Sequence, residues 1–171
     1  MNHRLIATTL LAAALIAGCK TSNPTDSTGR VSVQSPDGKI EFTLSGKGAL
    51  VYSVAVDGKP VLSESRLGLK FRDGLTLGAD ARLGKAEQTE SNTTWENPLG
   101  KRRIVRDHHR ELRASFVEKS GRSFEIVVRV FNDGLGFRYV LPAAPSGAAS
   151  DFVLEEEQTR FSFPGDYFCY A

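Results

Sequence analysis

The chain has 171 residues, a formal net charge of +2 and 25% charged residues. Its basic residues are scattered apart from one dense run, Lys101-Arg102-Arg103 with Arg106, which is interpreted as a solvated loop or strand edge. This distribution argues against a nucleic-acid partner, because such a partner requires a concentrated basic face. Its two cysteines, Cys19 and Cys169, are too few for a disulfide framework or a cysteine zinc site.

The N-terminus has the layout of an export signal. Residues 1–4 carry one Arg, and an apolar run follows over residues 5–17. This run is shorter than the about 20 residues that a transmembrane helix needs. It ends in Ile16-Ala17-Gly18-Cys19, which resembles the bacterial lipobox. We therefore expect residues 1–18 to be a lipoprotein signal peptide and Cys19 to be lipidated; the alternative is an ordinary signal peptide with an incidental Cys.

The segment after the lipobox has the composition of a tether. Residues 20–30 hold no hydrophobic side chain, so residues 19–30 are expected to be the lipidated Cys and a flexible linker. Lys20 is not the Asp associated with inner-membrane retention. The expected location is the cell envelope, on the outer rather than the inner membrane, at its periplasmic or surface face. Residues 31–171 then form one domain.

The first half of this domain shows short strands separated by Gly and Asp turns. Ile40, Phe42 and Leu44 alternate with polar residues, the period of a half-buried strand. The strands expected here cover residues 31–33, 39–44, 50–56, 60–62 and 67–71, with turns at 35–38, 57–58 and 73–74.

The second half repeats this pattern more clearly. Strands are expected over residues 112–116, 124–131, 135–141, 152–154 and 159–163. Seven residues on the inward faces of two of these strands are expected to build the core: Phe124, Ile126, Val128, Val130, Leu135, Phe137 and Tyr139. No segment after the signal peptide has a sustained helical period, so the pattern predicts an all-β antiparallel sandwich or barrel.

Several sequence blocks add a more specific resemblance. They are Ser35-Pro-Asp-Gly-Lys39, Asp57-Gly-Lys-Pro-Val61, Thr94-Trp-Glu-Asn-Pro-Leu-Gly-Lys101, Arg106-Asp-His-His-Arg-Glu-Leu112 and Arg129-Val-Phe-Asn-Asp-Gly-Leu-Gly-Phe-Arg-Tyr139. In this order and spacing they resemble the N-terminal domain of glycoside hydrolase family 97, over about Val31 to Tyr167.

The resemblance implies a fold and a division of labour. Family members are exported bacterial α-glucosidases and α-galactosidases with an N-terminal β-super-sandwich of the galactose-mutarotase-like type. Their catalytic barrel carries the acid and the base or nucleophile, and most ligands of a calcium ion. The chain ends at Ala171, before a barrel, so we expect a super-sandwich incomplete at its C-terminus, no cofactor in this chain and no glycosidase activity by itself. A truncated gene product and a stand-alone accessory module both remain open.

A few side chains are candidates for binding. Trp95 and Glu96 fall in an expected loop, where the tryptophan face either stacks on a sugar or caps the core. On a strand, the adjacent residues His108 and His109 would point to opposite faces, so one of them is expected in the core or at a domain interface. The acidic run of residues 155–157 is interpreted as a solvated edge rather than a catalytic pair.

The alternatives differ in class. A small mutarotase-like enzyme would use His108 or His109 with Glu111, and a structural surface lipoprotein would bind no sugar. Expected partners are the membrane through the anchor, with a carbohydrate ligand and a separate catalytic-barrel polypeptide left open. No metal-ligating residue is expected. Aromatic residues near the end, Phe163, Tyr167, Phe168 and Tyr170, are expected to be exposed and to favour self-association, with Cys169 cross-linking chains.

Overall fold

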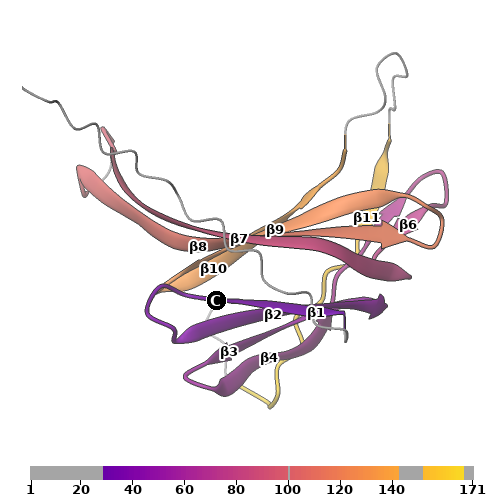
Figure 1. The fold of residues 1–171 in the computed structure, drawn as a ribbon, viewed down its shortest axis with the longest axis horizontal. Helices are drawn as coiled ribbons and strands as arrows, with labels where there is room; N and C mark the ends of the chain where they lie inside the picture. Colours follow the sequence, from indigo (N-terminus) through magenta and orange to yellow (C-terminus); the bar gives the residue numbers. More distant parts are fainter. Residues whose placement is uncertain (1–28, 100, 143–151, 168–171) are drawn as a thin grey trace, which may run out of the picture.

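The computed structural model describes residues 29–99, 101–142 and 152–167, and these residues form strands and connecting turns (Figure 1). The expectations for the signal peptide, Cys19, the tether up to residue 28, Phe168, Cys169 and Tyr170 lie outside the described residues, and Arg30, expected as the end of the tether, begins the first strand. The described strands are β1 (Arg30–Gln34), β2 (Ile40–Gly48), β3 (Leu50–Val56), β4 (Lys59–Arg66), β5 (Leu69–Phe71), β6 (Thr76–Leu77), β7 (Ala81–Glu96), β8 (Ile104–Glu118), β9 (Ser123–Phe131), β10 (Gly134–Val140) and β11 (Leu154–Glu157). Among the residues described, no helix is long and apolar enough to cross a membrane.

One antiparallel sheet supplies both main layers. Its strand order is β10-β9-β8-β7-β2-β3-β4. Strand β1 lies outside this order and pairs with residues 41–45 of β2. The sheet folds over, so that β7 to β10 lie above β1 to β4 in Figure 1. Strand β2 joins the layers, because residues 40–46 pair with β3 while Lys47 and Gly48 pair with Arg82 and Ala81. A smaller sheet, β11-β5-β6, lies at one end. The all-β antiparallel sandwich expected from the sequence is confirmed.

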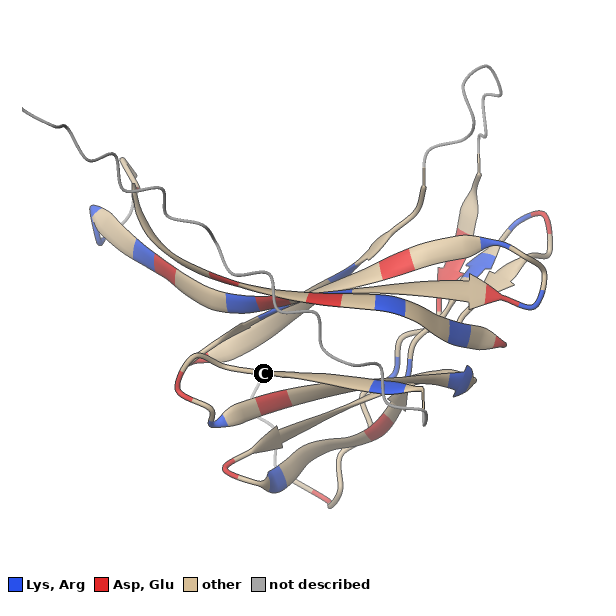
Figure 2. Cartoon of the chain, viewed as in Figure 1, with Lys and Arg blue, Asp and Glu red and all other residues tan. Residues whose placement is uncertain are grey.

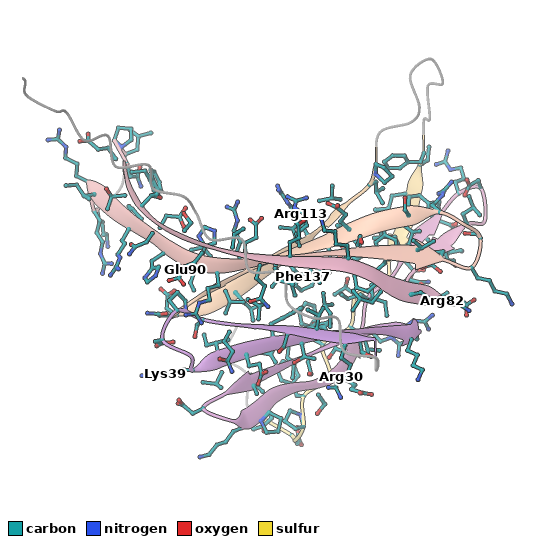
Figure 3. All side chains as sticks on the ribbon, in the orientation of Figure 1. Arg30, Lys39, Arg82, Glu90, Arg113 and Phe137 are labelled. Carbon is teal, nitrogen blue, oxygen red and sulfur yellow. The ribbon has the colours of Figure 1, made fainter. Side chains whose placement is uncertain are left out.

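The core lies between the two layers. The Phe42 and Tyr52 rings stack with centroids 5.5 Å apart, and Phe137 lies 5.4 Å from Tyr52. Figure 3 places Phe137 between the layers. The four core residues predicted on β9 are buried: Phe124, Ile126, Val128 and Val130. The three predicted on β10, Leu135, Phe137 and Tyr139, pack on the core but are only partly buried, because β10 is an edge strand.

The C-terminal segment differs from the expectation. The strand predicted over residues 152–154 begins only at Leu154 and runs through the acidic residues to Glu157, and no strand is assigned to residues 159–163. The latter segment still lies along β4, since the Arg160 amide donates to the Arg66 carbonyl and the Ser63 amide to the Ser162 carbonyl. Register shifts in the β3–β4 pair bend β4. The two hydrogen bonds between β4 and residues 160–162 therefore do not extend into a continuous ladder.

Strands β7 and β8 form a long ribbon that leaves the sandwich. Its pairing runs from Ala81↔Glu118 to Glu96↔Ile104, with one register shift between Leu83 and Ala86. We call its outer part, Ser91–Glu96 with Ile104–His108, the arm. Figure 1 shows the arm extending past the end of the lower layer. The prediction of a loop at Trp95 and Glu96 is therefore wrong, because both residues lie at the end of β7 and the turn follows them.

A buried carboxylate fixes the other end of this ribbon. Glu118 is 5% exposed and accepts hydrogen bonds from the Gly78 amide at 2.5 Å and the Asp80 amide at 3.0 Å. A buried charge without such partners would be strongly destabilising. Gly78 has φ +86°, and a Cβ there would lie 2.2 Å from the Leu67 carbonyl oxygen, so the turn that presents these amides needs glycine.

The crossing of β2 between layers yields a testable consequence. A Cβ on Gly46 would lie 2.6 Å from Cε1 of the buried Phe116 ring. We expect Gly46→Ala to lower the free energy of unfolding by about 1–3 kcal/mol, because a packed core does not accept extra volume. Chemical denaturation measures this.

The matched control is Gly136→Ala, since a Cβ there meets nothing within 4 Å. Its effect should stay within about 0.5 kcal/mol. Equal losses in the two variants would contradict the assigned packing of β2 against β8.

Candidate functional site

The arm carries the first pair of candidate residues. Trp95 pairs with Val105 and is 50% exposed, so the expectation that it caps the core is wrong. Glu96 forms an ion pair with Arg103 at 3.5 Å, and both side chains are exposed. The pairing of β7 with β8 continues to Glu96 because Thr93 and Thr94 have side chains that favour a strand. The expectation of a loop came from Pro98, which lies just beyond the strand. Trp95 lines neither of the two cavities described below.

His108 and His109 do lie on opposite faces of β8, as predicted. His108 Nε2 donates to Glu90 Oε1 at 2.8 Å, and Arg110 Nε donates to Glu90 Oε2 at 3.1 Å. These bonds, from His108 first and then Arg110, hold the pKa of Glu90 below its ordinary value. Figure 3 labels Glu90 where the arm leaves the sandwich. His108 therefore orders the base of the arm.

His109 occupies the opposite face and is 4% exposed. Its Nδ1 lies 2.5 Å from Asp107 Oδ1, and its ring lies 5.1 Å from the Phe131 ring. His109 is thus the buried histidine of the two, but it lies on the face of β8 opposite the core. An imidazole held by a carboxylate at one nitrogen has a fixed orientation, which suits a positioned hydrogen-bonding group.

Charged side chains continue from His109 across the same face, which we call the outer face. Glu111 accepts from Arg129 Nε at 2.7 Å and lies 3.9 Å from Arg113, which donates to Glu125 at 2.6 Å. Figure 3 shows Arg113 on the upper side of the sheet, away from the other layer. Glu111 shares this face with His109, the pair that a mutarotase-like enzyme would use, but each is bonded to another residue.

Two cavities lie near these elements. One, of about 230 Å³, opens over Gly136 on the outer face and is also lined by Val127, Arg129, Phe131, Phe137 and Arg138. The other, of about 390 Å³, we call the carboxyl-terminal cavity; it is lined by Pro60, Val61, Phe163, Gly165, Asp166 and Tyr167. Phe163 and Tyr167 are more than half exposed, as expected for these two aromatics. No local pattern indicates that Pro60 and Val61 lie opposite these two aromatics, because the contact joins residues about 100 positions apart.

The acidic run behaves as the predicted solvated edge. All residues of β11 are exposed. Each carboxylate has its own partner: Glu155 pairs with Lys70 at 3.1 Å, Glu156 accepts from Gln158 at 3.3 Å, and Glu157 accepts from Thr159 at 2.8 Å. The run therefore presents no shared acid–base pair.

The calcium that the resemblance implies does not fit the residues seen. Within residues 29–99, 101–142 and 152–167, no group of three or more His, Cys, Asp or Glu side chains could hold a metal ion. The carboxylates on the outer face are bonded to Arg129, Arg113 or His109 instead. No step of any reaction is derived through a metal for this chain.

Comparison with known proteins gives a consistent result. The sequence profile of the Glycosyl-hydrolase 97 N-terminal family matches residues 33–171. A probable retaining alpha-galactosidase of Streptomyces bingchenggensis is 32% identical over 143 residues, 80% of this chain and 22% of that protein. A retaining alpha-galactosidase of Bacteroides thetaiotaomicron is 22% identical over 135 residues, 79% of this chain and 19% of that protein.

Solved structures agree with these matches. A glycoside hydrolase family 97 enzyme from a Pseudoalteromonas species, in complex with panose, superposes with a TM-score of 0.73 at 29% identity, covering 78% of this chain and 20% of that one. A beta-arabinopyranosidase superposes with a TM-score of 0.71 at 29% identity, covering 78% of this chain and 21% of that one. The chain spans about a fifth of the length of the relatives it matches.

The two histidines give a paired prediction. His109→Ala should lower the free energy of unfolding by about 1–3 kcal/mol, because it empties the space beside Phe131 and leaves Asp107 without its partner. His108→Ala removes a bond to the half-exposed Glu90 and should cost less than about 1 kcal/mol. Urea denaturation of both variants measures the difference, and a larger loss for His108→Ala would contradict the assigned faces.

Proposed function

The chain belongs to glycoside hydrolase family 97 through its N-terminal domain, and on that premise we propose that it is a carbohydrate-associated accessory β-sandwich without hydrolytic activity of its own. The main support for this proposal is that neither of the two cavities is lined by a pair of carboxylates. The carboxyl-terminal cavity is lined by one, Asp166, and the cavity over Gly136 by none. Hydrolysis of a glycosidic bond generally requires a pair of carboxylates flanking it.

The domain then acts beside a catalytic barrel of the kind that the resemblance implies. The carboxyl-terminal cavity is the surface that contacts that barrel. The barrel belongs either to the same polypeptide or to a separate one. Val61, Phe163 and Tyr167 are 43%, 56% and 59% exposed there, and apolar side chains gathered in this way favour burial in an interface. The relatives are about five times as long as the part of them that this chain matches, and this supports such a partner.

We further propose that the chain is exported and lipidated at Cys19. The support is the apolar run of residues 5–17 followed by Gly18-Cys19. The acyl chains hold the domain on the membrane, because each buried methylene contributes about 0.8 kcal/mol. Lys20 after the modified Cys favours the outer membrane.

A mutarotase-like enzyme is the second candidate. The observation in its favour is the Asp107–His109 pair on the same face as Glu111. Glu111 is bonded to Arg129, however, so the acid and base that such an enzyme needs are not free in this arrangement.

Enzyme assays test the main proposal. The purified chain should give no turnover of nitrophenyl α-galactoside or nitrophenyl α-glucoside above buffer, with or without calcium, because neither of the two cavities is lined by a pair of carboxylates. Polarimetry on freshly dissolved α-galactose tests the second candidate in parallel. Sugar turnover that disappears in His109→Ala but persists in the folded control Val117→Ser would overturn the accessory role.

Fractionation tests the anchor. Wild-type chain should collect with membranes and carry acyl chains by mass spectrometry, and Cys19→Ala should lose the acyl mass. Unmodified wild-type protein in the soluble fraction would contradict the export proposal without bearing on the catalytic one.

A further inference from the structure

The tip of the arm is an apolar surface that the accessory role does not use. Trp95, Leu99 and Ile104 are 50%, 96% and 66% exposed. They come from the end of β7, the following turn and the start of β8, far along the ribbon from the core. Side chains so bare are unfavourable in water and imply burial against something outside the described chain.

Basic side chains surround these apolar residues. Lys101, Arg102, Arg103 and Arg106 are all exposed, and Figure 2 shows Lys and Arg gathered along the outer part of the arm. Glu96 is the one acid between Trp95 and Arg106, and it pairs with Arg103. Lys101 and Arg102 have no ion-pair partner within the described ranges. The tip therefore combines exposed apolar groups with an excess of positive charge.

The register shows that the apolar groups do not share one face. Trp95 pairs with Val105, while Ile104 pairs with Glu96, so Trp95 and Ile104 point to opposite sides of the ribbon. Leu99 lies in the turn between the strands. A protein partner lying against one face of the ribbon would leave the other face bare, whereas a lipid layer surrounds an inserted tip on all sides.

We propose that the tip of the arm docks on an anionic phospholipid surface. Leu99, Ile104 and the Trp95 ring enter the boundary between head groups and acyl chains, where tryptophan is favoured. The cations contact lipid phosphates, and each one near such a surface raises membrane affinity about fivefold. This contact is a second membrane signal beside the proposed acyl anchor.

Trp95 is the only tryptophan, so its fluorescence in the full chain reports on the arm alone. Addition of phosphatidylethanolamine vesicles containing phosphatidylglycerol should move its emission to shorter wavelength, and brominated acyl chains should quench it. Leu99→Ser should raise the lipid concentration at half-maximal shift about tenfold, because burial of an aliphatic side chain contributes that much. Arg102→Gln should raise it about fivefold.

Matched controls lie at the opposite end of β8. Val117→Ser removes an aliphatic side chain that is 45% exposed, and Lys119→Gln removes an exposed charge. Both should leave the lipid response unchanged, with circular dichroism confirming the fold of each variant. These measurements do not involve hydrolysis, so they fail or succeed independently of the accessory role.

Three results would overturn the proposal. Trp95 could keep a water-exposed emission while the chain sediments with anionic vesicles. The controls could weaken the response as much as the arm variants do. The emission shift could also appear without vesicles and grow with protein concentration, which would make the arm an interface between copies of the chain.

Discussion

Strands β7 and β8 keep one register from Ala81↔Glu118 to Glu96↔Ile104 apart from a single shift, and this register decides on which face each of their side chains lies. Successive residues of a strand point to opposite faces. The register therefore buries Leu112 and Phe116 in the core while it places Glu111 on the outer face. A slip by one residue would exchange the two sets and bury charges. Glu118, bonded to two backbone amides, opposes such a slip.

The same ribbon divides the molecule into parts with different roles. Its inner half is flanked by β2 and β9 within the sheet and packs on the core, whereas its outer half has few buried side chains. The base of the arm is ordered by Glu90, His108 and Arg110, and by His109 against Phe131 on the other face. The fold thus presents a bare tip at one place and the carboxyl-terminal cavity at another, each available to a different partner. The proposed accessory role requires such surfaces rather than a catalytic pair.

Local patterns predicted most of the strands but not their joint geometry. Alternation around Ile40 and Phe124 marked buried strands correctly, because one face of each lies on the core. The same reasoning placed His108 and His109 on opposite faces. It missed all of β7 and the outer part of β8, where no strand was expected. At Trp95, Pro98 suggested a loop where cross-strand pairing extends the ribbon. The carboxyl-terminal cavity and the Asp107–His109 contact with Phe131 depend on packing between distant segments, which periodicity does not encode.

Amide hydrogen exchange along β7 and β8 tests this account most directly. Amides of the core-packed half, such as those of Ala114 and Phe116, should exchange only through global unfolding. Amides of the arm, such as those of Thr93 and Val105, should exchange much faster through local opening, because few apolar contacts hold that half together. Uniform protection along the whole ribbon would contradict the division into a core-packed half and a bare arm.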